Sequence, residues 1–186
     1  MIKKIFNFLG RYRFRIIKVS NSNPITKNYL GKNEKYINLL KQSLKKNYEN
    51  INNLEKKYGY SIDQNWLNDL ALKTQISIKK SEPNFQHGRI LYLNLRNYIK
   101  NLDKNNNQVT VFETGTSLGF SAVCMAKAMK DADHKNFKIY TTDIIPSNKK
   151  IYWNKFGDEL GKRTRLEVLN EWQEYIENIT FLSGDT

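Results

Sequence analysis

The sequence predicts an α/β fold in which an α-helical region precedes half of a doubly wound, parallel sheet. Three apolar, β-branched segments predict the strands, at residues 109–112, 137–142 and 179–182. A helical pattern separates each segment from the next, which is typical of parallel strands joined by crossover helices. The fold expected from these observations is a three-stranded parallel sheet behind a group of helices.

Composition supports a folded protein and excludes several other classes. Of the 186 residues, 39% are hydrophobic and three are Trp, which is too apolar for a disordered chain. No apolar run reaches the length of about 18 residues that a membrane-spanning helix needs, and the N-terminus does not resemble a signal peptide. The single cysteine, Cys124, cannot form an internal disulfide. We expect it to be a small core residue in a cytoplasmic protein.

Charge divides the chain into a basic front and a neutral back. Residues 1–108 hold 21 Lys and Arg against 7 Asp and Glu, whereas residues 109–186 hold 10 against 11. We therefore expect a basic segment over 1–32, a helical region over 33–108 and a ligand-binding region over 109–186. The basic excess favours an anionic partner, and the alternative is a solvated lysine-rich surface. Segment 1–32 is either an amphipathic helix in peripheral contact with a membrane or a frayed tail, the interpretation we favour.

The helical region is expected to contain three helices. The first covers residues 33–58, because apolar side chains recur every seven positions, and Gly59 ends it. This stripe fits packing on the same domain better than a short coiled coil. The second helix is expected to begin at a capping box from Ser61 to Gln64, and the third covers 88–102.

The most informative stretch is the turn after the first predicted strand. Glu113 is followed by Gly115 and Gly119, and a helical pattern begins at Phe120. Glycines allow a positive φ and a close approach of a ligand, while the unpaired N–H groups of a helix N-terminus attract one. A nucleoside cofactor is the usual occupant. The spacing differs from the dinucleotide fingerprint G-x-G-x-x-G, which disfavours a nicotinamide-dependent oxidoreductase.

The second and third strands also end in polar residues. Asp143 follows the second strand, where a carboxylate can accept hydrogen bonds from both ribose hydroxyls of a nucleoside. The alternative is an aspartate that caps a loop. The third strand ends in a small polar turn, Ser183-Gly184-Asp185-Thr186. Between these strands, Thr164 and Glu167 predict a second capping box and a helix through Ile176.

The stretch from Glu113 to Val123 resembles the first motif of class I S-adenosylmethionine-dependent methyltransferases. In the catechol O-methyltransferase-like group, this motif runs Glu-x-Gly-x-x-x-Gly-(Tyr/Phe)-Ser-Ala-Val. The resemblance covers about residues 85–186. It implies a Rossmann-like fold, S-adenosyl-L-methionine as cofactor, and transfer of a methyl group to an oxygen of a small molecule or glycan. It places the cofactor at Glu113, Gly115, Thr116, Ser117, Gly119, Ser121, Asp143, Gly184, Asp185 and Thr186.

The resemblance also implies that the loop 85–88 approaches the methionine end of the cofactor. His87 is then either a group near the methyl donor or, as we favour, a surface or capping histidine. The chain stops at Thr186, whereas the family fold continues to a fourth strand whose acidic residues form the transfer centre. We therefore expect a C-terminally truncated form of the domain. No catalytic base or metal ligand can be named.

Without a fourth strand, the first strand would be a sheet edge. The remainder of a longer chain, a partner chain in an oligomer, or the front helices would have to cover it. The alternative function is a catalytically inactive module that acts through its basic N-terminal region on a membrane or protein partner. RNA is a less favoured acceptor, because no aromatic and basic signature of single-strand binding is present.

Overall fold

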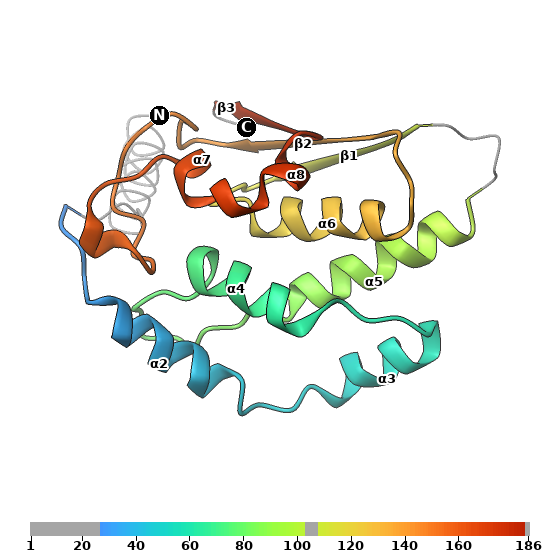
Figure 1. The fold of residues 1–186 in the computed structure, drawn as a ribbon, viewed down its shortest axis with the longest axis horizontal. Coiled ribbons are helices and arrows are strands. Elements are labelled where there is room, and N and C mark those ends of the chain that lie inside the picture. The colour runs from blue at the N-terminus through green and yellow to red at the C-terminus, as the bar shows by residue number, and fades with distance from the viewer. Residues whose placement is uncertain (1–26, 103–107, 185–186) are drawn as a thin grey trace, which may run out of the picture.

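The computed structural model describes residues 27–102 and 108–184. It is an α/β fold with a three-stranded parallel sheet, as the sequence predicted. Figure 1 shows the helices in layers on one side of the sheet. Nearest to the sheet are α6 (Phe120–Asp131), α7 (Arg165–Val168) and α8 (Gln173–Ile176). Beyond them lie α4 (Gln64–Thr74) and α5 (His87–Lys100), and α2 (Asn33–Ser43) and α3 (Glu49–Tyr58) are furthest away. None of the helices in the described residues is long and apolar enough to cross a membrane.

The sheet has the order β1-β2-β3 and consists of β1 (Val109–Thr114), β2 (Phe137–Asp143) and β3 (Ile179–Ser183). Val111 pairs with Ile139, which pairs in turn with Ile179. Inward-facing side chains such as Ile139 are fully buried, whereas the side chain of Phe112 on the opposite face is 64% exposed. The alternation shows that only one face of the sheet is packed against the described helices.

The β1 edge is not covered by the front helices. In the described residues, the only element in extensive contact with β1 is β2, and the front helices pack instead against α6 and one another. Of the three coverings considered from the sequence, the front helices are therefore ruled out for these residues.

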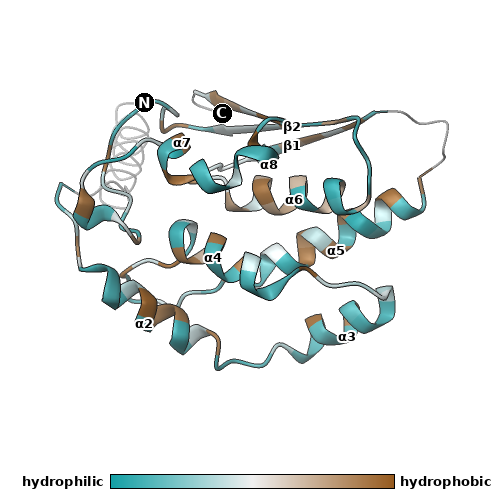
Figure 2. Ribbon diagram, viewed as in Figure 1, coloured by the Kyte–Doolittle hydropathy of each residue, from teal (hydrophilic) through white to brown (hydrophobic). Residues whose placement is uncertain are grey.

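The main core lies between the sheet and the front helices. α6 (Phe120–Asp131) is buried along nearly its whole length, and α5 (His87–Lys100) crosses it closely. Gly88 makes this approach possible, because a Cβ atom there would lie 2.7 Å from Phe120 and 2.9 Å from Cys124. Cys124 is fully buried, as expected of a core residue. Figure 2 shows hydrophobic segments on α5 and α6, whereas α3 is mostly hydrophilic.

The predicted single helix over 33–58 is wrong, since the segment forms α2 (Asn33–Ser43) and α3 (Glu49–Tyr58). The chain turns between them for two local reasons. The Leu40 carbonyl accepts both the Ser43 hydroxyl, at 2.8 Å, and the Leu44 N–H, at 3.0 Å, in the last turn of α2, and the polar side chain of Asn47 is exposed. Gly59 ends α3 in a left-handed conformation, with φ of 80°, as the sequence predicted.

The next helix begins later than predicted. α4 (Gln64–Thr74) is capped by Asp63, whose Oδ1 accepts the backbone N–H of Trp66 at 2.7 Å. Asp63 caps as well as Ser61 would, and Ile62 before it is anchored in the core with 1% exposure. The Ser61 capping box is therefore not formed.

The single helix expected after Thr164 is also wrong. The capping box of Thr164 and Glu167 is present, but it starts the short helix α7 (Arg165–Val168). Two further short helices follow, η2 (Asn170–Trp172) and α8 (Gln173–Ile176). The segment contributes side chains to two separate hydrophobic clusters, and it bends between them. Val168 packs in a small cluster with Leu118, whereas the buried residues of α8 pack in the main core.

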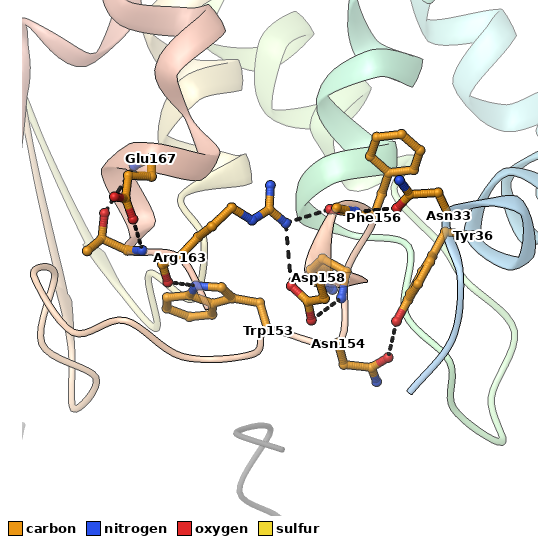
Figure 3. Close-up of polar contacts among 11 residues, drawn as sticks. Asn33, Tyr36, Trp153, Asn154, Phe156, Asp158, Arg163 and Glu167 are labelled. Carbon is orange, nitrogen blue, oxygen red and sulfur yellow. Dashed lines mark hydrogen bonds and ion pairs between the residues drawn. The ribbon is translucent and has the colours of Figure 1, made fainter. Parts of the chain in front are cut away.

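A network of polar contacts ties the front helices to the loop after β2, which contains the short helix η1 (Asp158–Leu160). Asn33 Oδ1 accepts the Gly157 N–H at 2.5 Å, and the Tyr36 hydroxyl donates to Asn154 Oδ1 at 3.2 Å (Figure 3). In the same loop, the indole of buried Trp153 donates to the Arg163 carbonyl at 2.8 Å. The helical region and the sheet region are thus joined by specific contacts as well as by packing.

Candidate functional site

The glycine turn between β1 and α6 has the backbone that its sequence predicted. Gly115 and Gly119 both have φ of 86°, and Ser117 between them has φ of 49°. A Cβ atom at Gly115 would meet nothing within 4 Å, whereas one at Gly119 would lie 3.3 Å from Leu169 and Phe181. Backbone conformation therefore requires the first glycine, and both conformation and packing require the second.

Asp143 closes this turn from the neighbouring strand. One carboxylate oxygen accepts the Ser117 N–H at 2.6 Å, and the other accepts the Ile145 N–H at 2.9 Å. The carboxylate thereby lies against the glycine turn instead of extending freely into solvent. Each oxygen keeps a further lone pair, so the group can still accept hydrogen bonds from a ligand.

The end of the third strand lies beside Asp143. The Gly184 N–H donates to the Asp143 carbonyl at 3.0 Å, and Ser183 Oγ accepts the Ser147 N–H at 3.3 Å. The ends of all three strands therefore meet at one edge of the sheet. Asp185 and Thr186, the last two predicted cofactor residues, lie outside the described residues.

Glu113 stabilises the glycine turn through hydrogen bonds with the hydroxyl groups of neighbouring threonine and serine residues. Its Oε2 accepts the Thr141 hydroxyl at 2.8 Å, and that hydroxyl lies 2.7 Å from Thr116 Oγ1. Burial raises the pKa of Glu113, while hydrogen bonds from Thr141 and Ser121 oppose the shift. Glu113, Thr116 and Ser121 thus belong to one network, in which Thr141 was not predicted from the sequence.

Arg165 is a further residue that the sequence reading missed. Its side chain is fully buried and donates from Nε to the Ser117 carbonyl at 2.6 Å and from Nη2 to the Ile145 carbonyl at 3.2 Å. Its Nη1 is buried without a partner among the described residues. Burial lowers the pKa of Arg165 and the charge of Asp143 opposes that shift, so the two charges lie close enough to interact.

The guanidinium of Arg165 also lies over two aromatic rings. Its Cζ is 5.9 Å from the ring centroid of Trp153 and 5.4 Å from that of Phe181. Cation–π contacts of this kind stabilise a buried cation. Arg165 therefore joins the glycine turn, the segment after β2 and the aromatic core beneath them. No motif in the sequence marks this arginine, because its partners are backbone carbonyls distant along the chain.

Of the predicted loop 85–88, His87 and Gly88 are the first residues of α5, and they lie against the start of α6. The His87 ring packs edge-on against Phe120 with 4.9 Å between centroids, and burial lowers the pKa of His87. Phe85 and Gln86 before it are buried, at 1% and 7% exposure. His87 is exposed, as the favoured interpretation of the sequence expected, and one face of its ring contacts the first residue of α6, which precedes Ser121.

In the described residues, no three His, Cys, Asp or Glu side chains lie close enough together to hold a metal ion. The arrangement instead offers a left-handed glycine turn, a helix N-terminus and a carboxylate held between them. Comparison of the chain with protein-family models and with curated proteins finds no match.

Proposed function

We propose that this chain binds S-adenosyl-L-methionine at the joined ends of its three strands and serves methyl transfer. The observation that carries the proposal is the contact between Asp143 and Ser117. It joins the strand-end carboxylate to the glycine turn, at 2.6 Å, on the same edge as Gly184. A carboxylate beside a helix N-terminus suits a nucleoside with a cationic sulfur, because it accepts from the ribose hydroxyls.

The contacts divide the predicted cofactor residues into two groups. Gly115, Ser117 and Gly184 are exposed, although their backbone N–H groups already donate to Thr142 or Asp143, and Asp143 offers the remaining lone pairs of its carboxylate to the ribose. The hydroxyls of Thr116 and Ser121 are engaged with Thr141 and Glu113. We therefore assign these two residues, together with Glu113 and Gly119, to ordering the turn, and Gly115, Ser117, Asp143 and Gly184 to direct contact.

When bound, the cofactor supplies a methyl group on sulfur, which an acceptor lone pair attacks in line with the leaving sulfur. The chain's own residues bind the donor and fix its orientation. By resemblance, the acceptor is an oxygen of a small molecule or glycan. No residue of the described chain is assigned as the base.

The alternative proposal is an inactive module that does not bind the cofactor. The engagement of both Asp143 oxygens by backbone N–H groups favours it, because a ligand must share or displace these hydrogen bonds. Titration calorimetry with S-adenosylmethionine on the full chain distinguishes the two proposals. Saturable 1:1 binding supports the enzyme, and its absence in a folded sample refutes it.

A matched pair of variants locates the site. Asp143→Asn keeps the side-chain shape but removes the charge, and should weaken binding about 10- to 100-fold, the equivalent of about 1.4–2.8 kcal/mol. Asp133→Asn alters an exposed loop aspartate after α6 and should leave binding unchanged. Equal affinities for the two variants would place the ligand elsewhere.

A further inference from the structure

Lys155 is a buried lysine whose amine has one hydrogen-bond partner. Its side chain lies in the loop after β2 with 7% exposure, and its Nζ donates to Ser77 Oγ, whose hydroxyl donates to the Gln75 carbonyl at 3.3 Å. A neutral amine can accept that hydroxyl proton once the hydroxyl rotates from Gln75 to Nζ. The described residues place no carboxylate in ion-pair contact with this amine. A buried ammonium without a counter-ion is costly, so the environment favours the neutral amine.

The backbone around this pair is held in place from two sides. Asn154, with φ of 56°, accepts the Ile78 N–H at 3.1 Å and donates to the Ile78 carbonyl at 2.9 Å. The Tyr36 hydroxyl of α2 donates to the same Asn154 side chain (Figure 3). Asn154 and Ile78 are the neighbours of Lys155 and Ser77 in the sequence, so these hydrogen bonds hold the two backbone segments that carry the pair side by side.

The charged groups around Lys155 shift its pKa in opposite directions. Burial, with the charge of Lys79, lowers the pKa of Lys155 to about 7, and the charge of Asp158 opposes the shift. Asp158 itself is committed to the Lys155 backbone N–H at 3.1 Å and to Arg163. About half of the molecules would carry a neutral amine at pH 7, whereas an ordinary lysine has fewer than about one in a thousand.

We propose that Ser77 and Lys155 form a reactive pair, in which Ser77 attacks the carbonyl carbon of a small ester or thioester and Lys155 takes the hydroxyl proton. A serine hydroxyl becomes a useful nucleophile when a neutral base accepts its proton, and serine–lysine pairs are one arrangement that achieves this. The Ser77 side chain is half-buried, so it borders solvent while the amine behind it does not.

The step balances within the pair. The Oγ–C bond forms, the proton moves to Lys155 Nζ, and the alcohol or thiol leaves with that proton when the C–O or C–S bond breaks. Water then attacks the acyl-serine, Lys155 takes the water proton, and Oγ regains it on release of the acid. The Ser77 N–H, which has no backbone acceptor among the described residues, and the Lys79 cation can stabilise the oxyanion.

The test is covalent labelling of the whole 186-residue chain by an alkyl fluorophosphonate, which transfers its phosphonyl group to an activated serine with loss of fluoride. We expect a single adduct at Ser77, mapped by peptide mass spectrometry, and a labelling rate that rises with pH to a plateau with a midpoint near 7. A wild-type rate without a midpoint between pH 6 and 9, or no adduct at Ser77, overturns the proposal without any variant.

Three variants sharpen the assignment. Lys155→Met retains the buried aliphatic stem and should label at least about 100-fold more slowly, whereas Ser77→Ala should not label. Ser81→Ala removes an exposed serine from the same segment and should label like the wild type. Circular dichroism confirms that each variant is folded. A folded Lys155→Met variant that labels at the wild-type rate would reduce Lys155 to a structural role and overturn the proposal.

Discussion

Replacement of Arg165 by methionine tests the role of the buried guanidinium beneath the glycine turn. The change removes two hydrogen bonds to backbone carbonyls, at 2.6 and 3.2 Å, and leaves the carbonyls of Ser117 and Ile145 without these donors. A hydrogen bond from a charged donor contributes about 1.5–3 kcal/mol, so the gross loss is about 3–6 kcal/mol. Relief of the guanidinium desolvation offsets part of this loss. We expect the free energy of unfolding to fall by about 3 kcal/mol.

The assay is urea unfolding followed by tryptophan fluorescence, since Trp153 lies directly beside the mutated side chain. For a chain of this size, the loss corresponds to a melting temperature lower by about 6–12 °C. Arg96→Met is the matched control, because Arg96 is half-buried over Tyr60 and Tyr92 and, within the described residues, makes a single hydrogen bond of 3.4 Å. It should lose about 1 kcal/mol. Equal losses for the two variants would refute the special role assigned to Arg165.

Three further variants test other features. Gly88→Ala should lower the free energy of unfolding by about 1–3 kcal/mol in urea titration, because its Cβ would lie 2.7 Å from Phe120. Thr164→Ala should lose about 1 kcal/mol in the same assay, since the hydroxyl accepts the Glu167 N–H at 3.1 Å, and no loss would show that the cap is not formed in solution. Lys155 has a folded pKa of about 7, below its unfolded value, so the unfolded chain binds more protons above pH 7. The wild type should gain stability from pH 7 to 9 with a slope of up to about 1.4 kcal/mol per pH unit, and Lys155→Met should show a smaller gain.

The features that the sequence predicted well are those set by neighbouring residues. The three strands follow from β-branched alternation, and the left-handed turn follows from Gly115 and Gly119, which adopt φ of 86°. Gly59 and Thr164 likewise end and begin helices where predicted, because caps depend on a few adjacent backbone groups.

The features that were missed depend on contacts between distant segments. The break between α2 and α3 interrupts a regular apolar stripe, because burial of that stripe depends on what packs against it and not on its spacing. From the sequence alone, Arg165 is expected to be an ordinary exposed arginine. Only the folded turn brings the Ser117 carbonyl close enough to accept its hydrogen bond. The Ser77–Lys155 contact joins residues 78 positions apart, and nothing local distinguishes that lysine from the other 30 basic residues.

The one-sided arrangement of helices gives the sheet two kinds of position that alternate along each strand. At inward positions such as Ile139, every methyl group is in contact, so a smaller side chain would leave a cavity. At outward positions, Phe112 and Leu182 are 64% and 42% exposed and contribute little to folding. Threonine at both outward sites would retain a high strand propensity while reducing the exposed apolar surface. The doubly substituted chain should therefore remain soluble at higher protein concentration than the wild type, and its melting temperature should be unchanged.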